Sequence, residues 1–212
     1  MNLKVLIVDD HEVARIGLST LLTGSGFSVV GSVATCSEAI ESLDRSIDVI
    51  LLDVRMPNQD GLSTLQKIRD IDIAVPVVIL SAYDNPTYIA RAAALGANDY
   101  LLKGGLPESI GKSLACVTNG ALPPPESRLT TIRRIMREQV NTKTLPKELP
   151  LTSREAQVLR HVGLGLSNKE IARSLEISVE TVKEHVQNVL RKIGAKDRTA
   201  AAVKAIKLGL VE

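Results

Sequence analysis

Five side chains of this sequence could take part in one reaction, because each stands at the carboxyl end of a short apolar run. They are Asp9, Asp10, Asp53, Ser81 and Lys103. Apolar runs of this length, bounded by turn residues, are typical of strands buried on both faces of a parallel sheet. Since open α/β sheets bind ligands beyond the carboxyl ends of their strands, we expect these side chains to meet in one crevice.

The carboxylates among them predict a metal site. Asp9, Asp10 and Asp53 would repel one another at one point, so a bound cation must offset the cost of keeping them ionised. Oxygen ligands without His or Cys suit a hard ion. Magnesium (Mg2+) fits best, because it prefers one or two carboxylates, water and a phosphate oxygen. The alternative is structural, with Asp9 and Asp10 capping the helix after them and Asp53 capping the next one.

A carboxylate beside Mg2+ that faces a lysine and a hydroxyl is equipped to accept a phosphoryl group. Asp53 would be the nucleophile, and it needs no general base because it is already ionised. Lys103 would neutralise developing charge on the phosphoryl oxygens, and Ser81 would hydrogen-bond one of them. Lys103 would also serve as a counter-ion for the acidic cluster. His11 is expected at the rim of the crevice rather than in the chemistry.

Alternating strand and helix patterns position these side chains. Apolar runs predict strands at 3–8, 27–33, 49–53, 75–80 and 98–102. Helical periodicity predicts helices at 12–22, with Gly24 placed to end the first, and at 37–43, 62–69, 87–95 and 106–118. This alternation indicates a doubly wound α/β fold, a flavodoxin-like five-stranded parallel sheet in the order 2-1-3-4-5.

Composition and charge divide the chain. Residues 1–120 carry 9 Lys or Arg against 14 Asp or Glu, whereas residues 151–212 carry 11 against 7, which suggests a second part that meets a polyanion. With no Trp and one Phe, base stacking is excluded as the main binding mode. Two cysteines without metal-ligand spacing, no signal peptide and no long apolar run predict a cytoplasmic protein.

We expect a linker between the two parts and a small all-α domain after it. Residues 121–149 begin with a run of three prolines and then permit a basic helix at 128–140, followed by a second spacer. Residues 150–212 predict four short helices, the first two with the capping-box pairs Thr152/Glu155 and Ser167/Glu170. A short turn and a longer helix from Val179, polar on its outer face, indicate a helix-turn-helix.

The first 120 residues resemble the receiver domain of bacterial response regulators. The resemblance rests on these segments in this order and spacing: Asp9-Asp10, Asp53 through Met56-Pro57 to Asp60-Gly61, Ser81-Ala82 and Lys103. It implies that Asp53 takes a phosphoryl group from a phosphohistidine of a sensor histidine kinase. It also implies Mg2+ bound by Asp10 directly, by Asp9 through water, and by Asp53 and the backbone carbonyl of Arg55.

The same resemblance implies a switch and contains one departure. Tyr100 matches the aromatic residue that swings inward when the hydroxyl matching Ser81 moves toward the phosphate. Arg55 and Tyr83 fall where the family tunes the lifetime of the phosphorylated form. Many receivers have Pro after the lysine, whereas this chain has Gly104, so the conformation of that loop is left open.

Residues 150–212 resemble the DNA-binding domain of the NarL/FixJ (LuxR-type) regulators. The matching segments are Leu151-Thr-Ser-Arg-Glu155, Gly165 to Ala172, Ile177-Ser178, Thr181 to His185 and Arg198. The resemblance implies a recognition helix at 179–192 in the major groove of double-stranded DNA. It places Lys183, Glu184 and Gln187 nearest the base edges. The side chains expected to contact DNA phosphates are Lys169, Thr181, Arg191 and Lys192.

One short helix buries little surface, so we expect sequence-specific DNA binding to require a homodimer on paired half-sites. The last helix, 198–208, would supply the contact through Ala200, Val203 and Leu208, or these side chains would close the domain's own core. The sequence thus predicts a phosphorylation-dependent transcriptional regulator, an enzyme only toward its own phosphoryl group.

Three alternatives stay open at this point. The first is an aspartyl-phosphate phosphatase, although Val54-Arg55 replaces its usual second aspartate. The second is a nucleotide-binding flavodoxin-like domain, although Gly24-Ser-Gly26 follows a helix rather than a strand. The third is a DNA-binding protein with a vestigial acidic site.

Overall fold

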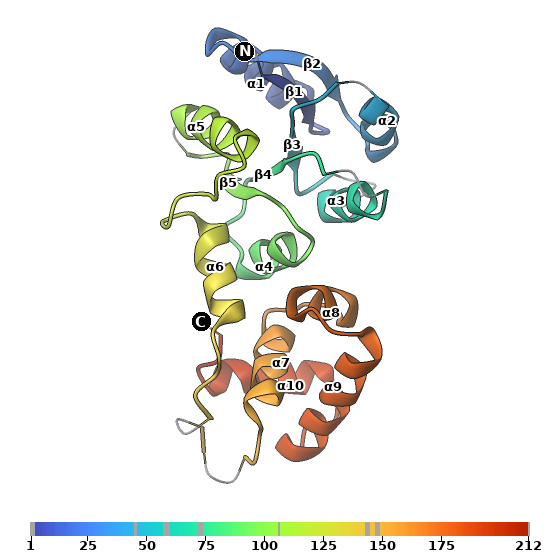
Figure 1. Ribbon diagram of the computed structural model, residues 1–212, viewed down its shortest axis with the longest axis vertical. Coiled ribbons are helices and arrows are strands. Elements are labelled where there is room, and N and C mark those ends of the chain that lie inside the picture. The colour runs from blue at the N-terminus through green and yellow to red at the C-terminus, as the bar shows by residue number, and fades with distance from the viewer. Residues whose placement is uncertain are drawn as a thin grey trace. The chain divides into compact units, whose positions relative to one another are not determined.

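The computed structural model describes residues 3–44, 46–56, 60–71, 74–105, 107–142, 145–146 and 149–211. The chain forms two compact units, Met1–Thr131 and Ile132–Glu212, which are described separately (Figure 1). Pro57, Leu106 and residues 143–144 and 147–148 of the expected second spacer lie outside the described residues. No helix within the described ranges is long and apolar enough to cross a membrane.

The first unit is built on the parallel sheet that the sequence predicts. Its strands are β1 Lys4–Val8, β2 Ser28–Val33, β3 Val49–Asp53, β4 Val77–Ser81 and β5 Asp99–Leu102, in the order β2-β1-β3-β4-β5. All neighbouring pairs are parallel. The fold class and the strand order are therefore confirmed, and the carboxyl ends of β1, β3 and β4 lie at one edge of the sheet.

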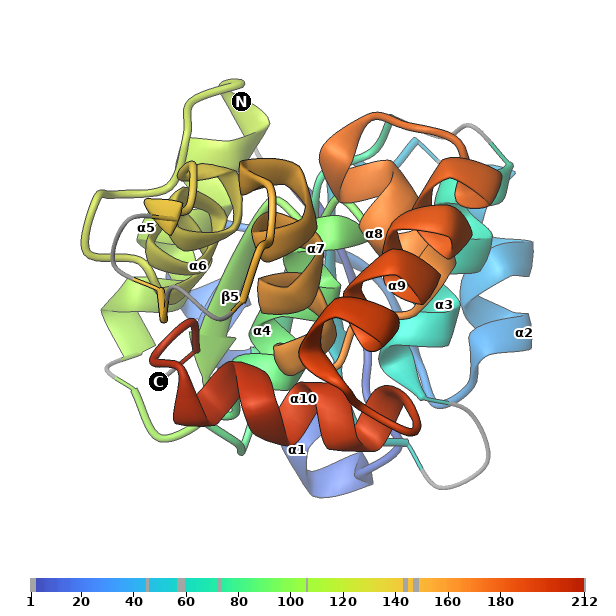
Figure 2. The same cartoon turned by 90° about the horizontal axis from the view of Figure 1, so that it is seen from below.

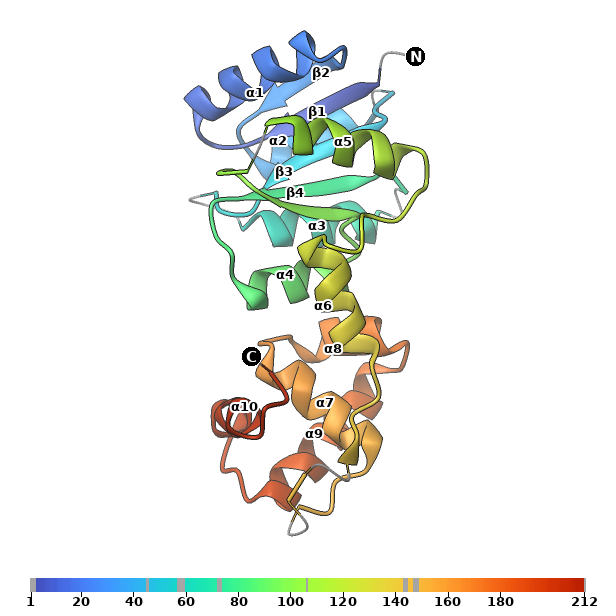
Figure 3. The same cartoon turned by 90° about the vertical axis from the view of Figure 1, so that its left-hand side faces the viewer.

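Helices cover both faces of this sheet, as Figure 3 shows. They are α1 Glu12–Gly24, α2 Cys36–Glu41 with the 3-10 turn η1 Ser42–Asp44, α3 Gly61–Asp70, α4 Pro86–Ala94 and α5 Pro107–Thr118. Alternate strand residues such as Val5 and Ile7 pack in one buried cluster with Leu22 of α1 and Leu114 of α5. The apolar runs are thus buried on both faces, which explains why they lack a polar alternation.

One helix end differs from the expectation. Gly24 is the last residue of α1 rather than the residue that ends it. The left-handed backbone conformation falls two residues later, at Gly26, whose φ is 85°. Glycine is favoured there because the missing Cβ removes the steric penalty of a positive φ.

The stretch that the sequence gives as a linker contains α6, Arg128–Arg137, which is shorter than the expected helix at 128–140. Ser127 precedes α6, and its Oγ accepts a hydrogen bond from the Leu129 amide at 3.2 Å. The division between the two compact units falls inside this helix, after Thr131.

The second unit contains the four expected helices, seen from another side in Figure 2. They are α7 Ser153–Gly163, α8 Asn168–Leu175, α9 Val179–Ile193 and α10 Arg198–Lys207. Both predicted capping boxes are present at the starts of α7 and α8. Val182, Val189 and Ile193 form the buried stripe of α9.

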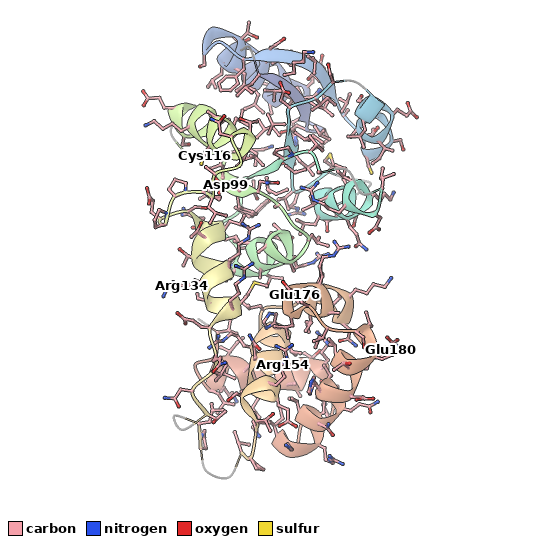
Figure 4. The ribbon with its side chains drawn as sticks, viewed as in Figure 1. Asp99, Cys116, Arg134, Arg154, Glu176 and Glu180 are labelled. Atoms are coloured by element: carbon pink, nitrogen blue, oxygen red, sulfur yellow. The ribbon has the colours of Figure 1, made fainter. Side chains whose placement is uncertain are left out.

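The turn between α8 and α9 depends on Glu176, which is labelled in Figure 4. Glu176 has φ 54° and ψ 45°, the left-handed conformation, and its amide caps α8. It is the one non-glycine residue with positive φ in the described part of the chain. Ser178 then caps α9 by accepting a hydrogen bond from the Thr181 amide at 3.0 Å, so the three residues 176–178 separate the helices of the helix-turn-helix.

A neutral histidine lies in the core of this unit. His161 is fully buried, its Nδ1 lies 2.8 Å from the Gln157 carbonyl oxygen and its Nε2 lies 3.0 Å from Ser174 Oγ. Burial lowers the pKa of His161 from 6.5 to about 4. Charging this imidazole would therefore oppose folding.

The pH dependence of the second unit follows from this shift. Because the folded pKa lies below the unfolded one, the unfolded chain binds more protons between pH 6.5 and 4. We expect the unfolding free energy of this unit to fall by ~3 kcal/mol as the pH drops through that window. Hydrogen exchange of the α7 and α9 amides in the full chain measures it. The variant His161→Gln cannot become charged and should show a flatter profile; an unchanged slope would assign the acid sensitivity elsewhere.

Candidate functional site

A cavity of about 880 Å³ opens at the carboxyl edge of the sheet in the first unit. Its walls include Asp10, Asp53, Ser81 and Lys103. Asp9 joins them through Lys103, whose Nζ lies 2.6 Å from Asp9 Oδ2. The structure therefore brings together all five side chains that the sequence placed at strand ends.

Lys103 bridges the carboxylates of β1 and β3. Its Nζ lies 2.6 Å from Asp9 Oδ2 and 2.9 Å from Asp53 Oδ1, and both carboxylates are almost fully buried. Burial by itself lowers the pKa of Lys103, but the hydrogen bonds with Asp9 and Asp53 outweigh it and hold the pKa above its ordinary value. Lys103 is thus a fixed positive charge in contact with the candidate nucleophile.

Burial has the opposite consequence for Asp53. It raises the pKa of this carboxyl group above its usual value of 3.8, although Lys103 and the Arg55 amide both favour the ionised form. The Arg55 amide donates to Asp53 Oδ2 at 3.1 Å, so each carboxylate oxygen has one partner. The raised pKa means that burial makes the ionised form of Asp53 less stable than it is in water.

The third carboxylate is not satisfied in the same way. Asp10 Oδ1 is buried and accepts no hydrogen bond. His11 Nδ1 lies 2.9 Å away, which is close enough for an ion pair but lacks hydrogen-bond geometry, and its ring is largely exposed at the rim. A buried carboxylate oxygen without a donor, beside two further carboxylates, fits a hard cation with oxygen ligands.

The loop after Asp53 is shaped by a close approach of the backbone. A Cβ on Gly61 would lie 1.9 Å from the Asp53 carbonyl oxygen, so only glycine fits at this position. The Gly61 amide donates to the Val54 carbonyl at 2.8 Å, and Asp60 caps α3 by accepting from the Leu62 amide at 3.1 Å. The Asp60-Gly61 pair thereby returns the chain under the end of β3.

The expected switch residues lie next to this cavity. Ser81 is buried, and its Oγ accepts a hydrogen bond from the Tyr83 amide at 3.0 Å. Tyr100 is 2% exposed and points inward, with its hydroxyl donating to the Tyr83 carbonyl at 2.9 Å. Burial raises the pKa of Tyr100. The guanidinium of Arg55 lies 5.1 Å from the centre of the Tyr83 ring.

Gly104 follows Lys103 without the proline that many receivers have. No cis peptide bond occurs in the part of the chain that the structure describes.

The outer face of α9 in the second unit is polar and exposed. Lys183, Glu184, Gln187 and Arg191 are exposed on this helix, Thr181 is half-buried near its start, and Lys169 is exposed on α8. Lys183 Nζ lies 3.5 Å from Glu180, and Arg191 donates to Asn188 at 2.9 Å. The apolar stripe of the same helix faces the core.

The sequence did not reveal the partner of Lys192. Its Nζ lies 2.7 Å from Oε2 of Glu155, which is 5% exposed and closes the capping box of α7. Burial by itself raises the pKa of Glu155, but the hydrogen bonds from Lys192 and Thr152 outweigh it and lower the pKa. An ammonium has three donors, and Glu155 takes one of them among the described residues. The capping-box motif could be recognised in the sequence, but the ion-pair partner of Glu155, 37 residues away, could not.

Comparison with known proteins agrees with both units. Residues 5–115 match the response regulator receiver domain, and residues 149–205 match the luxR family of bacterial regulatory proteins. The chain is 35% identical over 216 residues to the transcriptional regulatory protein LnrK of Bacillus subtilis (strain 168), covering 98% of each chain. It is 37% identical over 204 residues to a nitrate/nitrite response regulator protein homolog of Haemophilus influenzae, covering 95% of each.

A solved structure has the same two-part organisation. The response regulator ChrA of a heme-sensing two-component system is 30% identical, with a TM-score of 0.53 over 99% of each chain. The fold and the carboxylate–lysine site define a receiver joined to a helix-turn-helix domain. The chain belongs to the two-component response regulators with a LuxR-type DNA-binding domain, the NarL/FixJ family.

The buried charge of Asp53 has a measurable consequence for stability. Because the folded pKa is raised, ionisation of Asp53 opposes folding at neutral pH, and this cost disappears as the pH falls through that pKa toward 3.8. We expect Asp53→Asn to raise the unfolding free energy of the metal-free protein at pH 7 by ~1 kcal/mol. Thermal unfolding at several pH values measures it. The exposed Glu41→Gln is the matched control, and an Asp53→Asn protein less stable than wild type would contradict the expectation.

Proposed function

We propose that this chain is a phosphorylation-dependent DNA-binding transcriptional regulator. Asp53 accepts a phosphoryl group from a sensor histidine kinase in the presence of Mg2+, and the modification changes dimerisation and DNA binding. The observation that carries this proposal is the bridge from Lys103 Nζ to Asp9 and Asp53, since it fixes a positive charge beside a buried, ionised nucleophile. The protein acts in the cytoplasm and catalyses only its own phosphorylation and dephosphorylation.

The transfer step requires little of the protein beyond position and charge. A carboxylate oxygen of Asp53 forms a bond to phosphorus while the bond from phosphorus to the kinase histidine nitrogen breaks. The Lys103 ammonium shifts from the Asp53 carboxylate to a phosphoryl oxygen as negative charge develops there. The Ser81 hydroxyl donates to another, because its hydrogen is not used in accepting the Tyr83 amide.

The metal site would be completed by this chain's oxygens. Asp10 would bind Mg2+ directly, Asp9 through water, and Asp53 and the Arg55 backbone carbonyl would supply the other protein oxygens. The buried, unsatisfied Asp10 Oδ1 supports this assignment. When bound, the ion supplies positive charge that neutralises the phosphoryl oxygens during transfer.

The switch would act through the segment after β4. Movement of Ser81 toward a phosphate draws the Tyr83 amide with it, and Tyr100 holds the Tyr83 carbonyl from the other side. Arg55 and Tyr83, stacked at the mouth of the cavity, would set the lifetime of the phosphorylated form by limiting access of water.

In the second domain, α9 would be the recognition helix. Its exposed side chains Lys183, Glu184 and Gln187 would read base edges in the major groove. Contacts to DNA phosphates would come from a second group of side chains: Lys169, Thr181, Arg191 and Lys192.

The domains are proposed at 1–120 for the receiver, 121–149 for the linker with α6, and 150–212 for the DNA-binding domain. The active form would be a homodimer on paired half-sites. Val203 on α10 is 48% exposed and apolar, which fits a dimer contact, whereas Ala201 and Ala205 are buried within the unit.

Phosphorylation gives the central test. Wild-type protein treated with acetyl phosphate and Mg2+ should gain one phosphoryl group by intact mass, shift toward dimer in analytical ultracentrifugation, and bind DNA more tightly by a factor of about 5–150. Asp53→Asn should show none of these changes, and neither should wild type with EDTA. If wild type and Asp53→Asn respond alike, the role assigned to Asp53 is wrong.

Substitutions on α8 and α9 separate the two kinds of DNA contact. On a site selected from random sequences, Lys183→Ala and Gln187→Ala should each cost ~1–3 kcal/mol and relax the base preference. Lys169→Gln and Arg191→Gln should weaken selected and random DNA alike and reduce the salt slope by about 1 each. Lys207→Gln on α10 removes the same charge as a control. Equal losses on both kinds of DNA for Lys183→Ala would exclude base readout.

A further inference from the structure

The segment from Ser81 to Asp84 makes hydrogen bonds through Ser81, Tyr83 and Asp84. Ser81 Oγ accepts the Tyr83 amide at 3.0 Å, and the Tyr83 carbonyl accepts the Tyr100 hydroxyl at 2.9 Å. The next side chain, Asp84, forms a two-point ion pair with Arg128. Arg128 Nε and Nη2 lie 2.7 Å and 2.6 Å from the two carboxylate oxygens. A displacement of Ser81 is therefore transmitted along four residues to a charged contact.

The partner of Asp84 is the first residue of α6. A positive side chain at the start of a helix is disfavoured by the helix dipole, so Arg128 is not there to stabilise α6 by itself. No acidic residue occupies the first turn of α6 to offset it. The hydrogen bonds from Arg128 lower the pKa of Asp84, and Asp84 in turn raises the pKa of Arg128, so both groups are held in their charged forms.

A second contact holds the same end of α6 to β5. Ser127 Oγ donates to Asp99 Oδ1 at 2.7 Å, and Ser113 Oγ of α5 donates to Asp99 Oδ2 at 2.6 Å. Asp99 is 2% exposed; Figure 4 labels it beside α5. Leu129, the second residue of the helix, is fully buried. Asp99 is buried and lies on a core strand, so this contact is suited to act as a fixed pivot.

The two contacts differ in strength. Arg128 and Asp84 are 45% and 52% exposed, so their ion pair is weakened by water and salt, whereas the Asp99 contacts are not. A cavity of about 630 Å³, lined by residues that include Pro124, Ser127 and Arg128, separates the stretch before α6 from β5 and α5. The start of α6 is thus held by the buried Leu129 side chain and by a few polar contacts beside a cavity.

We propose that the Asp84–Arg128 ion pair is the output contact of the receiver, which loosens when phosphorylated Asp53 draws in Ser81 and thereby frees the first turn of α6 to move about the Ser127–Asp99 pivot. The proposal rests on the phosphorylation of Asp53 proposed above. The rest of α6 belongs to the second compact unit, where Arg160 donates to the Glu138 carbonyl and Gln157 to the Met136 carbonyl. The continuous backbone of α6 therefore joins Arg128, the ion-pair partner of the switch segment, to the DNA-binding unit.

Thermodynamic reciprocity makes the direction testable. If phosphorylation disfavours the ion pair, then loss of the ion pair must favour phosphorylation by the same factor. An exposed pair of this kind corresponds to about a two- to fivefold effect. The Asp84→Asn and Arg128→Gln proteins should therefore keep the phosphoryl group two- to fivefold more readily at equilibrium with the same phosphodonor.

Hydrogen exchange of the full chain tests the contact itself. In unphosphorylated protein, Asp84→Asn should speed exchange of the α6 amides at 129–131 by about two- to fivefold. The charge exchange Asp84→Arg with Arg128→Asp should restore protection. Arg134→Gln, which removes an exposed α6 charge that pairs with Glu138 at 3.2 Å in a comparable ion pair, is the matched control. Unchanged exchange in Asp84→Asn, or no restoration by the charge exchange, would overturn the proposal.

Phosphorylated wild type completes the experiment, with the phosphoryl group counted by intact mass in the same samples. The amides at 129–131 of phosphorylated wild type should exchange as fast as those of unphosphorylated Asp84→Asn. Phosphorylation of Asp84→Asn should not speed their exchange further. Phosphorylated protein with unchanged or slower exchange at α6 overturns the output contact and leaves the phosphorylation of Asp53 intact. A chain that gains no phosphoryl group instead overturns the proposed function, and the output role with it.

Discussion

The receiver depends on keeping buried carboxylates ionised at the edge of a parallel sheet. Lys103 makes this possible, because its ammonium lies within 3 Å of both Asp9 and Asp53. In the proposed phosphoryl transfer, the same contact would let Lys103 follow the charge that a phosphoryl group brings to Asp53. Burial raises the pKa of Asp53 even so, which means that the site is held at a cost to the stability of the fold.

The loops around this site are fixed by backbone contacts rather than by bulky side chains. Gly61 lies so close to the Asp53 carbonyl that no Cβ fits, and the Tyr83 amide and carbonyl are held by Ser81 and Tyr100. Such a segment cannot shift at one residue alone. These hydrogen bonds and the Asp84–Arg128 ion pair join the segment beside Asp53 to the first residue of α6.

In the DNA-binding unit, too, a single charged side chain has more than one role. Capping boxes stand at the N-termini of α7 and α8. The carboxylate of Glu155 both caps α7 and pairs with Lys192 of α9. His161 stays neutral inside the core, so the unit carries no unpaired buried charge from that residue. The polar side chains of α9 are left on the outer face, available for a polyanion.

The sequence by itself determined the elements and the cluster of carboxylates, serine and lysine at the strand ends. The strand segments are continuously apolar rather than alternating, and segments with helical periodicity separate them, which indicates a parallel sheet. Parallel strands bring their carboxyl ends to one edge, so Asp53 and Lys103 had to converge. Only the tertiary structure decided the long-range pairs, such as Asp84 with Arg128 and Glu155 with Lys192. No local pattern specifies a partner dozens of residues away, because a side-chain ion pair depends on how separate elements pack.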